Sequence, residues 1–309
     1  MWLCVAAVLA GLLLLRRWHR ERQTVPGLRE KHVLITGCDS GFGNLLARQL
    51  DGRGLRVLAA CLTEAGAARL RAATSPRLQT VLLDVTSSQS IAAASAWVRE
   101  RVGDRGLWGL VNNAGIGSPA APNEWLTKDD FVKVLDVNLV GLVEVTLSLL
   151  PLVRRARGRV VNVASVMGRV SFFGGGYCVS KFGVEAFSDS LRLEMRSFGV
   201  KVSVIEPGYF NTMITNVENL ERNFLSTWEK LPEEIKTSYG ESYLKQRNYN
   251  SDLSLVTNCM EHALTSLHPR ARYSAGWDAK LLYIPLSYLP SALTDVVFTL
   301  FYPKSAGKA

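Results

Sequence analysis

The stretch TGCDSGFG, residues 36–43, decides the fold, because it follows a short apolar run and opens a segment of helical periodicity. Glycines at such a turn let the backbone approach a pyrophosphate, and the next helix presents its N-terminal N–H groups to it. The spacing is G-x-x-x-G-x-G, not the commoner G-x-G-x-x-G. In isolation a plain tight turn explains these glycines equally well. Their place after the first strand of an alternating pattern favours a dinucleotide site, with candidate contacts Thr36, Gly37, Asp39, Ser40, Gly41, Phe42 and Gly43.

From Lys31 onward, short apolar runs alternate with segments of helical periodicity. This alternation predicts an α/β fold of one domain: a Rossmann-type, doubly wound parallel sheet with helices on both faces. Only the long stretch after Pro207 breaks the rhythm. The predicted strands are His32–Thr36, Arg56–Cys61, Leu78–Leu83, Trp108–Asn112, Arg159–Val163, Lys201–Ile205 and Ala271–Ser274. The predicted helical segments include Asn44–Arg53, Ser88–Val102, Lys128–Leu150 and Tyr177–Phe198.

Polar and glycine-rich residues follow several of the predicted strands. The fourth strand runs into NNAG at 112–115, and the fifth runs into Ser165. In open α/β sheets, ligands bind beyond the carboxyl ends of the strands, so these residues are candidates for one common site. Asn112 is also explained as a plain strand-terminal residue, and that alternative stays open. The candidates at this edge are Asn112, Ala114, Gly115, Ser165, Pro207, Gly208 and Thr212.

Tyr177 and Lys181 are four residues apart, which puts them on one face of a helix, one turn from each other. A free tyrosine has a pKa of about 10, and a nearby ammonium favours the phenolate and lowers that pKa. The hydroxyl of Ser165 can hydrogen-bond the same substrate oxygen. Such a set suits proton exchange with an alcohol or a ketone. Alone, such a pair is in most cases a surface lysine beside a half-buried tyrosine, but the other signals at this edge favour chemistry.

The composition fits one large domain with appendages: 309 residues, 48% of them hydrophobic, with a formal net charge of +9. No recognition motif accompanies the charge, which argues against a nucleic-acid partner. Five cysteines without paired spacing indicate neither disulfides nor a zinc site, so no metal ligand is proposed. A basic cluster is interpreted as a solvated loop, with anionic lipid contact as the alternative: Arg154, Arg155, Arg157 and Arg159. The histidines, without ligand spacing, are treated as structural: His19, His32, His262 and His268.

The N-terminal run Met1–Leu15 contains no charged residue and is followed at once by Arg16 and Arg17. A cleaved signal peptide has its positive charge before the apolar run and a small-residue cleavage site after it. The opposite order here predicts an uncleaved membrane anchor, with the following domain in the cytosol. The run is shorter than the roughly 20 residues that usually span a bilayer, so spanning and lying in one leaflet both stay open.

A second apolar stretch, Leu281–Phe301, is broken by Pro285, Pro290 and Asp295. It is interpreted either as a packed C-terminal extension or as a hydrophobic arm that rests on the bilayer. The predicted boundaries are residues 1–24 for the anchor and its basic flank, 28–275 for the catalytic domain with a substrate lid at about 209–252, and 276–309 for the C-terminal extension.

Taken together, these motifs resemble the short-chain dehydrogenases/reductases over roughly Lys31 to Ser274. The resemblance rests on TGCDSGFG, NNAG, LDVNLVG at 135–141, YCVSK at 177–181 and PGYFNT at 207–212. It implies that Tyr177 takes a proton, that Ser165 holds the substrate oxygen, and that Lys181 binds the nicotinamide ribose and depresses the tyrosine pKa. A fourth member is implied to keep a water in place for a proton relay. The implied catalytic tetrad is Asn138, Ser165, Tyr177 and Lys181.

Flanking stretches such as GGGYCVSKFGVEAFSDS at 174–190 and RYSAGWDAKLLYIPLSYLP at 272–290 resemble the membrane-bound retinol dehydrogenase group. That group includes enzymes of retinols and of 3α- or 17β-hydroxysteroids. The resemblance implies a lipophilic alcohol substrate, an endoplasmic reticulum (microsomal) membrane location and a homodimer, which is common in the family. Two departures are Ala164, where relatives commonly have serine, and a shorter stretch at Tyr243–Asp252. The second bears on substrate identity more than on catalysis.

The end of the second strand bears on the choice of cofactor. An arginine or lysine there meets the 2′-phosphate of NADP, while an acid on the ribose 2′-hydroxyl marks NAD. Cys61, Leu62 and Thr63 carry neither signal, but Asp39 in the glycine turn is acidic and no basic residue stands there. We therefore expect NAD, with NADP less favoured. Asp84, after the third strand, is the adenine contact that the family implies, and a helix N-cap is the equal alternative.

The segment after Pro207 is rich in aromatic and apolar side chains. Core packing of a small helical cap explains any one of them. As a group above the site they suit a long apolar alcohol. They are Tyr209, Phe210, Met213, Ile214, Phe224, Trp228, Tyr239 and Tyr243.

Two functional hypotheses of different class follow. The first is NAD-dependent oxidation of a lipophilic secondary or allylic alcohol: retinol to retinaldehyde, a 3α-hydroxysteroid to a 3-ketosteroid, or both, with a steroid-specific 3α/17β enzyme as its variant. The second is a membrane-tethered binding or scaffold protein with little turnover. Degraded members of such families usually lose the tyrosine or the lysine. Tyr177 and Lys181 are both present, which favours the enzyme.

Overall fold

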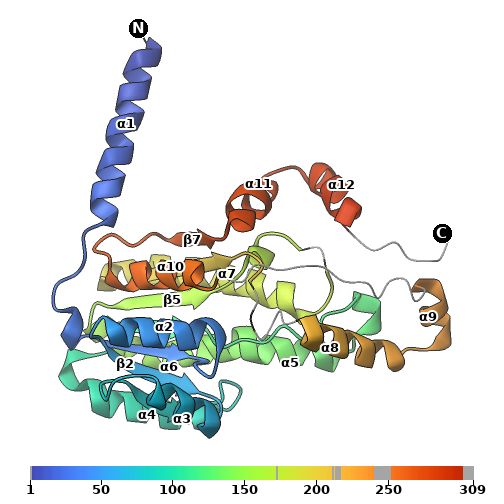
Figure 1. The fold of residues 1–309 in the computed structure, drawn as a ribbon, viewed down its shortest axis with the longest axis horizontal. Coiled ribbons are helices and arrows are strands. Elements are labelled where there is room, and N and C mark those ends of the chain that lie inside the picture. The colour runs from blue at the N-terminus through green and yellow to red at the C-terminus, as the bar shows by residue number, and fades with distance from the viewer. Residues whose placement is uncertain (1, 172, 211, 213–216, 240–251, 302–309) are drawn as a thin grey trace.

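The computed structural model describes residues 2–171, 173–210, 212, 217–239 and 252–301. Parts of the predicted lid, including Met213, Ile214 and Tyr243, lie outside the described residues. Seven strands form one sheet in the order β3-β2-β1-β4-β5-β6-β7 (Figure 1). Every neighbouring pair of strands is parallel. The Rossmann-type sheet predicted from the sequence is therefore confirmed.

All seven strands form where the apolar runs predicted them, because parallel strands are buried on both faces and read as continuous apolar segments. Three have the predicted bounds, and four shift by one or two residues. The strands are β1 His32–Thr36, β2 Arg56–Cys61, β3 Gln79–Leu82, β4 Gly109–Asn112, β5 Arg159–Val163, β6 Lys201–Pro207 and β7 Arg272–Ala275.

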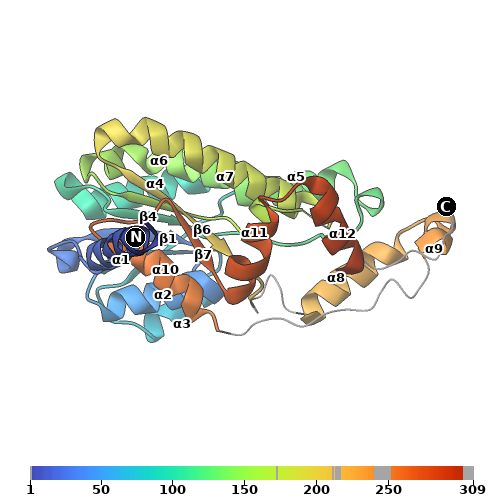
Figure 2. The same cartoon turned by 90° about the horizontal axis from the view of Figure 1, so that it is seen from above.

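Helices cover both faces of the sheet, so the domain has three layers (Figure 2). Leu46, Leu50 and Met260 anchor one helical layer to the sheet, and Val145 and Leu149 anchor the other. The first layer holds α2 Gly41–Gly52, α3 Glu64–Ala72 and α10 Ser254–Thr265; the second holds α4 Ser88–Val102, α6 Gly141–Arg155 and α7 Gly176–Glu194. The strand order reverses between β1 and β4, which is where such sheets open a crevice for ligands.

The predicted helical segment Lys128–Leu150 is interrupted. It comprises α5 Lys128–Leu135, a π-helical turn Asp136–Val140, and α6, which continues to Arg155. Within the described chain, Lys128–Arg155 is a helical stretch long and apolar enough to cross a membrane by length and composition. It belongs instead to the folded domain, since Val134 and Val145 are buried in it.

Helix α1, Trp2–Glu21, projects away from the domain, as Figure 1 shows. The side chains of Leu12, Leu13 and Leu14 are exposed. The helix is attached at its last turn, where Glu21 pairs with Arg270. The N-terminal run therefore forms a helix whose apolar side chains are not part of the core.

The C-terminal stretch forms short helices on the side of the domain toward which α1 projects (Figure 1). Pro285 stands in the first turn of the first α-helix here, and exposed Leu293, Val296 and Leu300 face away from the core. These elements are a π turn Ala279–Tyr283, α11 Ile284–Leu286 and α12 Ser291–Phe301; the lid holds α8 Val217–Glu229 and α9 Glu233–Tyr239. Short 3-10 turns lie at Leu28–Glu30 (η1), Gly103–Arg105, Asn123–Trp125, Val166–Gly168 and Met195–Phe198.

The predicted exposure to solvent is right for three arginines of the basic cluster and wrong for the fourth. The predicted loop is wrong for Arg154 and Arg155, because they form the end of α6. Arg154, Arg155 and Arg157 are exposed. Arg159 begins β5 and is buried, where its guanidinium donates to the carbonyls of Leu264 and Ser266. Arg159 thus donates to backbone carbonyls at the end of α10 instead of to solvent, as the local sequence had suggested.

Candidate functional site

The glycine-rich turn after β1 has a shape that side chains would block. Gly37 and Gly41 adopt φ of +70° and +59°, a region that favours glycine. A Cβ on Gly43 would lie 2.4 Å from the Gly37 carbonyl oxygen. Ser40 precedes α2 without capping it through its side chain. The first N–H groups of α2 are therefore left for a ligand, and an anion suits them best.

The ends of β1 and β4 are tied together by hydrogen bonds. The Thr36 hydroxyl accepts from the backbone N–H groups of Asn113 and Ala114, each at 3.0 Å. The Asn113 amide donates to the carbonyls of Thr36 and Gly37 at 2.9 and 3.1 Å. The predicted candidates Thr36 and Ala114 thus hold the turn in shape. The sequence analysis passed over Asn113, although it stands beside Asn112 in the same motif.

Asn112 points away from the site. Its amide donates to the Thr146 hydroxyl at 2.8 Å and to the Asn162 side chain at 2.9 Å, both in the buried space beneath the sheet. This geometry favours the interpretation of Asn112 as a structural residue at the end of β4. Asn113 lines the cavity in its place.

A cavity of about 160 Å³ opens at the carboxyl edge of the sheet. It brings together the predicted Ser165, Tyr177 and Lys181, from the end of β5 and from α7, with the glycine turn of β1. The remaining lining residues are Gly37, Ser40, Gly41, Phe42, Asn113, Gly115, Val163, Ala164, Pro207, Gly208, Phe210 and Thr212.

Burial shifts the pKa values of both Tyr177 and Lys181. Burial raises the pKa of Tyr177 to about 12, and a hydrogen bond with Ser165 acts in the opposite direction. Lys181 does not lower that pKa in this arrangement, because its Nζ donates to the Val163 carbonyl at 2.8 Å and lies 5.5 Å from the centroid of the tyrosine ring. Burial also lowers the pKa of Lys181 to about 8. Desolvation is therefore the main cause of both pKa shifts.

Asn138 is buried in the π-helical turn between α5 and α6. Its side-chain oxygen accepts from the Ile116 backbone N–H at 2.8 Å, and its amide donates to the Ile116 carbonyl at 2.9 Å and to the Ser180 hydroxyl at 3.1 Å. It therefore links the segment after NNAG to α7. π-helical turns occur frequently at functional sites.

A buried cluster of charges lies behind Lys181, and the sequence analysis missed it. Glu185, one turn further along α7, accepts from Arg272 at 3.1 Å, and its Oε1 has no hydrogen-bond partner. Glu206 of β6 accepts from Arg169 at 3.1 Å. Burial and the charge of Glu206 raise the pKa of Glu185 to about 7, and Glu185 in turn raises that of Lys181. The sequence did contain a signal for Glu185, because it stands four residues after Lys181 in the same helical segment.

The two acidic candidates lie outside the cavity. Asp39 accepts from the backbone N–H groups of Leu62 and Thr63 at 2.7 and 3.0 Å, which holds its carboxylate at the end of β2. Asp84 is exposed and accepts from the backbone and hydroxyl of Thr86. The N-cap of α4 is Ser87, so the alternative that Asp84 caps that helix is wrong.

An apolar wall adjoins Tyr177. Met167, Val170 and Phe173 contribute to it from the segment before α7, and the Phe173 ring stacks on Tyr177 at 6.2 Å between centroids. Tyr209 is the predicted lid residue that joins it. The C-terminal arm adds three side chains that the sequence analysis did not assign to the site: Tyr283, Ile284 and Phe298.

The other predicted lid aromatics do not join this wall. Phe224, Trp228 and Tyr239 pack around Trp125, with ring centroids 5.0–5.2 Å away. Phe210 is buried in the main core but reaches the cavity. Phe224, Trp228 and Tyr239 therefore fit the default interpretation, in which they pack the core of a helical cap.

Comparison with known proteins identifies the family. The family described as short chain dehydrogenase matches residues 31–223. The chain is 63% identical to human retinol dehydrogenase 16 over 99% of both chains, and 64% identical to rat retinol dehydrogenase 7 over 96% of both. It is 61% identical to human 17-beta-hydroxysteroid dehydrogenase type 6 over 99% of both.

Solved structures agree on the fold. A short-chain dehydrogenase from Streptomyces avermitilis is similar with a TM-score of 0.67 and 27% identity, over 88% of this chain and 95% of that one. Levodione reductase is similar with a TM-score of 0.68 and 26% identity, over 82% and 98%. This protein belongs to the short-chain dehydrogenase family and is an oxidoreductase. The family and enzyme predictions are confirmed, and the scaffold hypothesis loses its basis.

Proposed function

We propose that this protein oxidises a lipophilic alcohol, retinol to retinaldehyde or a 3α-hydroxysteroid to a 3-ketosteroid, with NAD as the acceptor. One observation carries the proposal: Ser165, Tyr177 and Lys181 meet at a cavity that also contains the N-terminus of α2. An acid/base set and an anion-binding turn at one sheet edge are what hydride transfer from an alcohol requires.

The residues at the carboxyl edge fit a nicotinamide dinucleotide. The glycine turn leaves a cradle that a Cβ on Gly43 would fill, and α2 begins without a side-chain cap. Gly37, Gly41 and the first N–H groups of α2 would hold the pyrophosphate, and Lys181 the nicotinamide ribose. When bound, the nicotinamide supplies a hydride acceptor.

The proton steps belong to this chain's own side chains. The Ser165 hydroxyl donates to the alcohol oxygen and orients it, and the Tyr177 phenolate accepts the alcohol proton. Because burial holds the Tyr177 pKa at about 12, forming that phenolate needs positive charge close to the ring, which the Lys181 ammonium supplies by leaving the Val163 carbonyl. Asn138 keeps the Ile116 segment and Ser180 in position for this relay.

The preference for NAD rests on Asp39. Its carboxylate stands at the end of β2, where the ribose 2′-hydroxyl is bound in this fold. Hydrogen bonds from the Thr63 hydroxyl and from Leu62 keep the pKa of Asp39 below its ordinary value, so the group is charged at neutral pH. A 2′-phosphate would meet like charge there, while a 2′-hydroxyl can donate to the carboxylate.

The substrate class rests on the apolar wall beside Tyr177 and on the relatives. Phe173, Tyr209 and Tyr283 offer ring faces and edges to a long apolar molecule. Similar proteins are named as retinol dehydrogenases and as a 17-beta-hydroxysteroid dehydrogenase. The latter supports a steroid-specific enzyme as the second candidate.

We also propose that the protein is held at the endoplasmic reticulum membrane by α1, with the catalytic domain in the cytosol. Exposed leucines such as Leu13 suit the hydrocarbon region, and Arg16 and Arg17 follow them on the cytosolic side. Helix α12, with exposed Leu293 and Val296, lies on the side of the domain toward which α1 projects (Figure 1). A homodimer, common in the family, is part of the proposal, and light scattering of the detergent-solubilised protein tests it.

The deciding experiment incubates membranes containing the protein with all-trans-retinol and, separately, with a 3α-hydroxy androgen, each with NAD and with NADP. We expect retinaldehyde or ketosteroid with NAD. Ketosteroid alone would select the steroid enzyme. Absence of product from both alcohols, in membranes whose protein binds NADH, would contradict the proposal.

A further inference from the structure

A buried carboxylate lies where the catalytic cavity meets the C-terminal arm, residues 276–301. Asp278 follows β7 closely and is 9% exposed. Its Oδ2 accepts from the Tyr209 backbone N–H at 2.7 Å, whereas its Oδ1 is buried without a hydrogen-bond partner among the described residues. A buried carboxylate with only part of its hydrogen-bonding capacity used is costly, so its position calls for an explanation.

This carboxylate does not serve its own helical turn. Asp278 directly precedes the π turn Ala279–Tyr283, and an aspartate before a helix commonly accepts from the first N–H groups of that helix. Asp278 makes no such hydrogen bond. Its side chain reaches across to the segment that follows β6 instead, so capping of the arm does not explain the contact with Tyr209.

Two glycines make room for the carboxylate. A Cβ on Gly208 would lie 2.3 Å from both carboxylate oxygens of Asp278, and a Cβ on Gly276 would lie 2.4 Å from Oδ1. Gly276 also has a φ of +98°, in a region that favours glycine. The absence of a side chain at Gly208, a predicted cofactor contact, therefore also accommodates a carboxylate from the far end of the chain.

The segment held by Asp278 lies beside the reacting groups. Strands β6 and β7 end as register partners at Pro207 and Ala275. The Pro207 carbonyl oxygen lies 3.5 Å from the Ser165 Oγ, and Gly208 lines the cavity. The position of this backbone thus determines where that carbonyl stands next to the serine hydroxyl.

The arm holds the same segment at a second point. The ring of Tyr209 lies 5.9 Å from that of Tyr283, measured between centroids. Ala279, next to Asp278, is fully buried in the apolar cluster against which Tyr177 packs. Tyr209 is therefore held by Asp278 at its backbone and contacted by Tyr283 at its ring.

We propose that Asp278 is a positioning residue for the reaction. Its carboxylate holds the Gly208–Tyr209 backbone, and through it the Pro207 carbonyl beside Ser165 and the edge of the cavity where a nicotinamide would bind. A hydrogen bond to a charged acceptor is stronger than one between neutral groups, which suits a brace. The reaction itself is that of the proposed function, on which this role rests. The C-terminal arm is then part of the framework of the active site.

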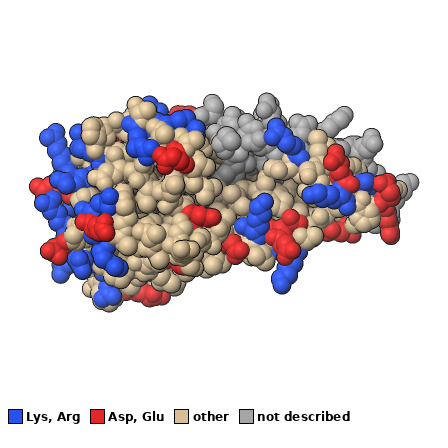
Figure 3. All heavy atoms as spheres, turned by 90° about the horizontal axis from the view of Figure 1, so that it is seen from below, with Lys and Arg blue, Asp and Glu red and all other residues tan. Residues whose placement is uncertain are grey.

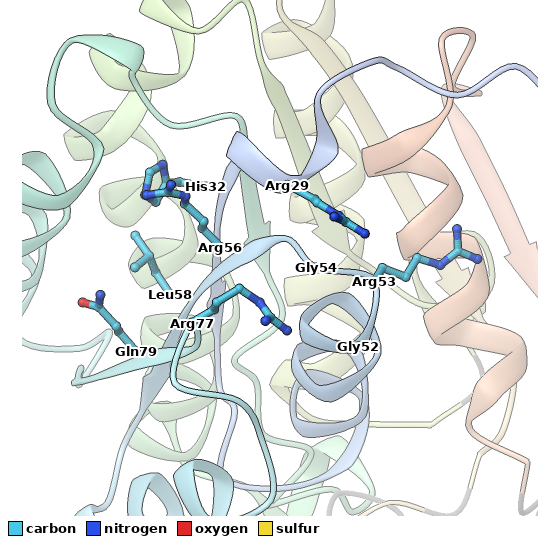
Figure 4. Close-up of a pocket in the computed structure, with 9 residues that line it drawn as sticks. All are labelled: Arg29, His32, Gly52, Arg53, Gly54, Arg56, Leu58, Arg77 and Gln79. Atoms are coloured by element: carbon cyan, nitrogen blue, oxygen red, sulfur yellow. The ribbon is translucent and has the colours of Figure 1, made fainter.

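The two larger hollows at the opposite edge of the sheet are lined by exposed arginines. One, of about 600 Å³, opens where the strands begin, and Figure 3 shows Lys and Arg side chains gathered at this end of the molecule. In Figure 4 the arginines that line it do not converge on one point. The other, of about 620 Å³, includes Arg154, Arg155 and Arg157. Surface arginines alone do not make a built site, so neither hollow is assigned a ligand.

The test compares the wild type with Asp278→Ala, Asp278→Asn and Asp295→Ala, each as the full chain in detergent micelles. Asp295 is the matched control, because it is an exposed carboxylate of the same arm. Four quantities are measured: hydrogen–deuterium exchange of the backbone at 205–210, the Kd of NADH by fluorescence titration, kcat and KM for the alcohol, and the unfolding temperature.

In Asp278→Ala we expect faster exchange at 205–210 and NADH binding weakened by about tenfold, which corresponds to 1.4 kcal/mol. The kcat should fall by at least about tenfold, because a misplacement of about 1 Å can cost about 10²-fold, while KM changes less. Asp278→Asn retains a neutral acceptor oxygen, so its values should lie between those of the wild type and Asp278→Ala. Asp295→Ala should behave like the wild type.

A merely structural role would lower the unfolding temperature of Asp278→Ala and leave its exchange at 205–210, NADH affinity and kcat unchanged, which would overturn the proposal. Equal losses in Asp295→Ala would overturn it as well. If Asp278→Ala does not fold, Asp278→Asn decides, and exchange equal to that of the wild type would then count against the brace. Failure of the wild type to oxidise either alcohol contradicts the proposed function alone, since exchange and NADH affinity still measure what Asp278 holds.

Discussion

The two edges of the sheet differ in how they hold charge. At the carboxyl edge Lys181, which lines the cavity, is 6% exposed and lies among glycine, hydroxyl and apolar groups. At the amino edge Arg53 and Arg77 stand in solvent, each 52% exposed, although Arg159 at the start of β5 is buried. Burial shifts the pKa values of groups at the carboxyl edge, whereas water screens the charges at the amino edge.

This difference follows from the topology of a parallel α/β sheet. Every helix between two strands ends at the amino edge and begins at the carboxyl edge. Cations are favourable at helix C-termini and anions at helix N-termini. Arg53 after α2 and Arg155 at the end of α6 follow the first rule, and the uncapped start of α2 follows the second. Arg56 follows neither rule, because it begins β2 and lies at no helix end.

The largest effect should come from Tyr177→Phe, which removes the proton acceptor of the carboxyl edge and keeps the ring. We expect alcohol oxidation to fall by about 10²–10⁴-fold or more, measured as initial rates in membranes, with NADH binding retained. Tyr288→Phe, on the exposed part of the C-terminal arm, is the control and should keep its activity. Full activity of the Tyr177 variant would refute the mechanism.

The two ends of α2 allow a direct comparison of the edges. Gly43→Ala places a Cβ 2.4 Å from the Gly37 carbonyl oxygen, whereas Gly52→Ala meets nothing within 4 Å. Overpacking costs about 1–3 kcal/mol, so Gly43→Ala should weaken NADH binding by about tenfold or more. Gly52→Ala should leave it unchanged and stabilise the fold by about 0.4–1 kcal/mol. Fluorescence titration and thermal unfolding measure the two effects; equal NADH affinity in both variants would argue against the assigned cradle.

A smaller effect should follow from Asp39→Ser. Removing the carboxylate at the end of β2 takes away the repulsion of a 2′-phosphate, so the ratio of kcat/KM with NADP to that with NAD should rise by about tenfold, the equivalent of 1.4 kcal/mol. Asp84→Asn is the matched control. The adenine contact that the family implies for Asp84 would be made with both nucleotides, so this variant should leave the ratio unchanged. An unaltered ratio in Asp39→Ser would remove the basis for the NAD preference.

The smallest effect should be a shift of the pH profile in Glu185→Gln. Glu185 is charged only above its raised pKa of about 7 and then raises the pKa of Lys181. Without it the Lys181 pKa drops below about 8, so the ammonium that supports the phenolate is lost at lower pH. The optimum of alcohol oxidation should move to lower pH. Asp189→Asn, which removes another partner of Arg272, should leave the optimum in place; a shift of equal size there would assign the effect to Arg272.

Some features of the site could be predicted because they depend on neighbouring residues. The apolar runs placed every strand, and the glycine spacing placed the turn that follows β1. The π-helical turn inside Lys128–Leu150 could not be predicted, because it forms where Asn138 bonds to Ile116, a residue from another part of the chain. Arg159 was assigned to solvent for the same reason, since its acceptors are the carbonyls at the end of α10.

The sequence by itself determined the family, the strand order along the chain, and which residue types stand at the carboxyl edge. Only the tertiary structure decided that the pKa of Tyr177 is raised, that Glu185 lies behind Lys181 in a buried cluster, and that His32 and Arg56 are neighbours in β1 and β2. Periodicity and motifs are local properties, because they depend on residues that are a few positions apart. Burial, and the register that sets distant side chains side by side, exist only once the sheet has assembled.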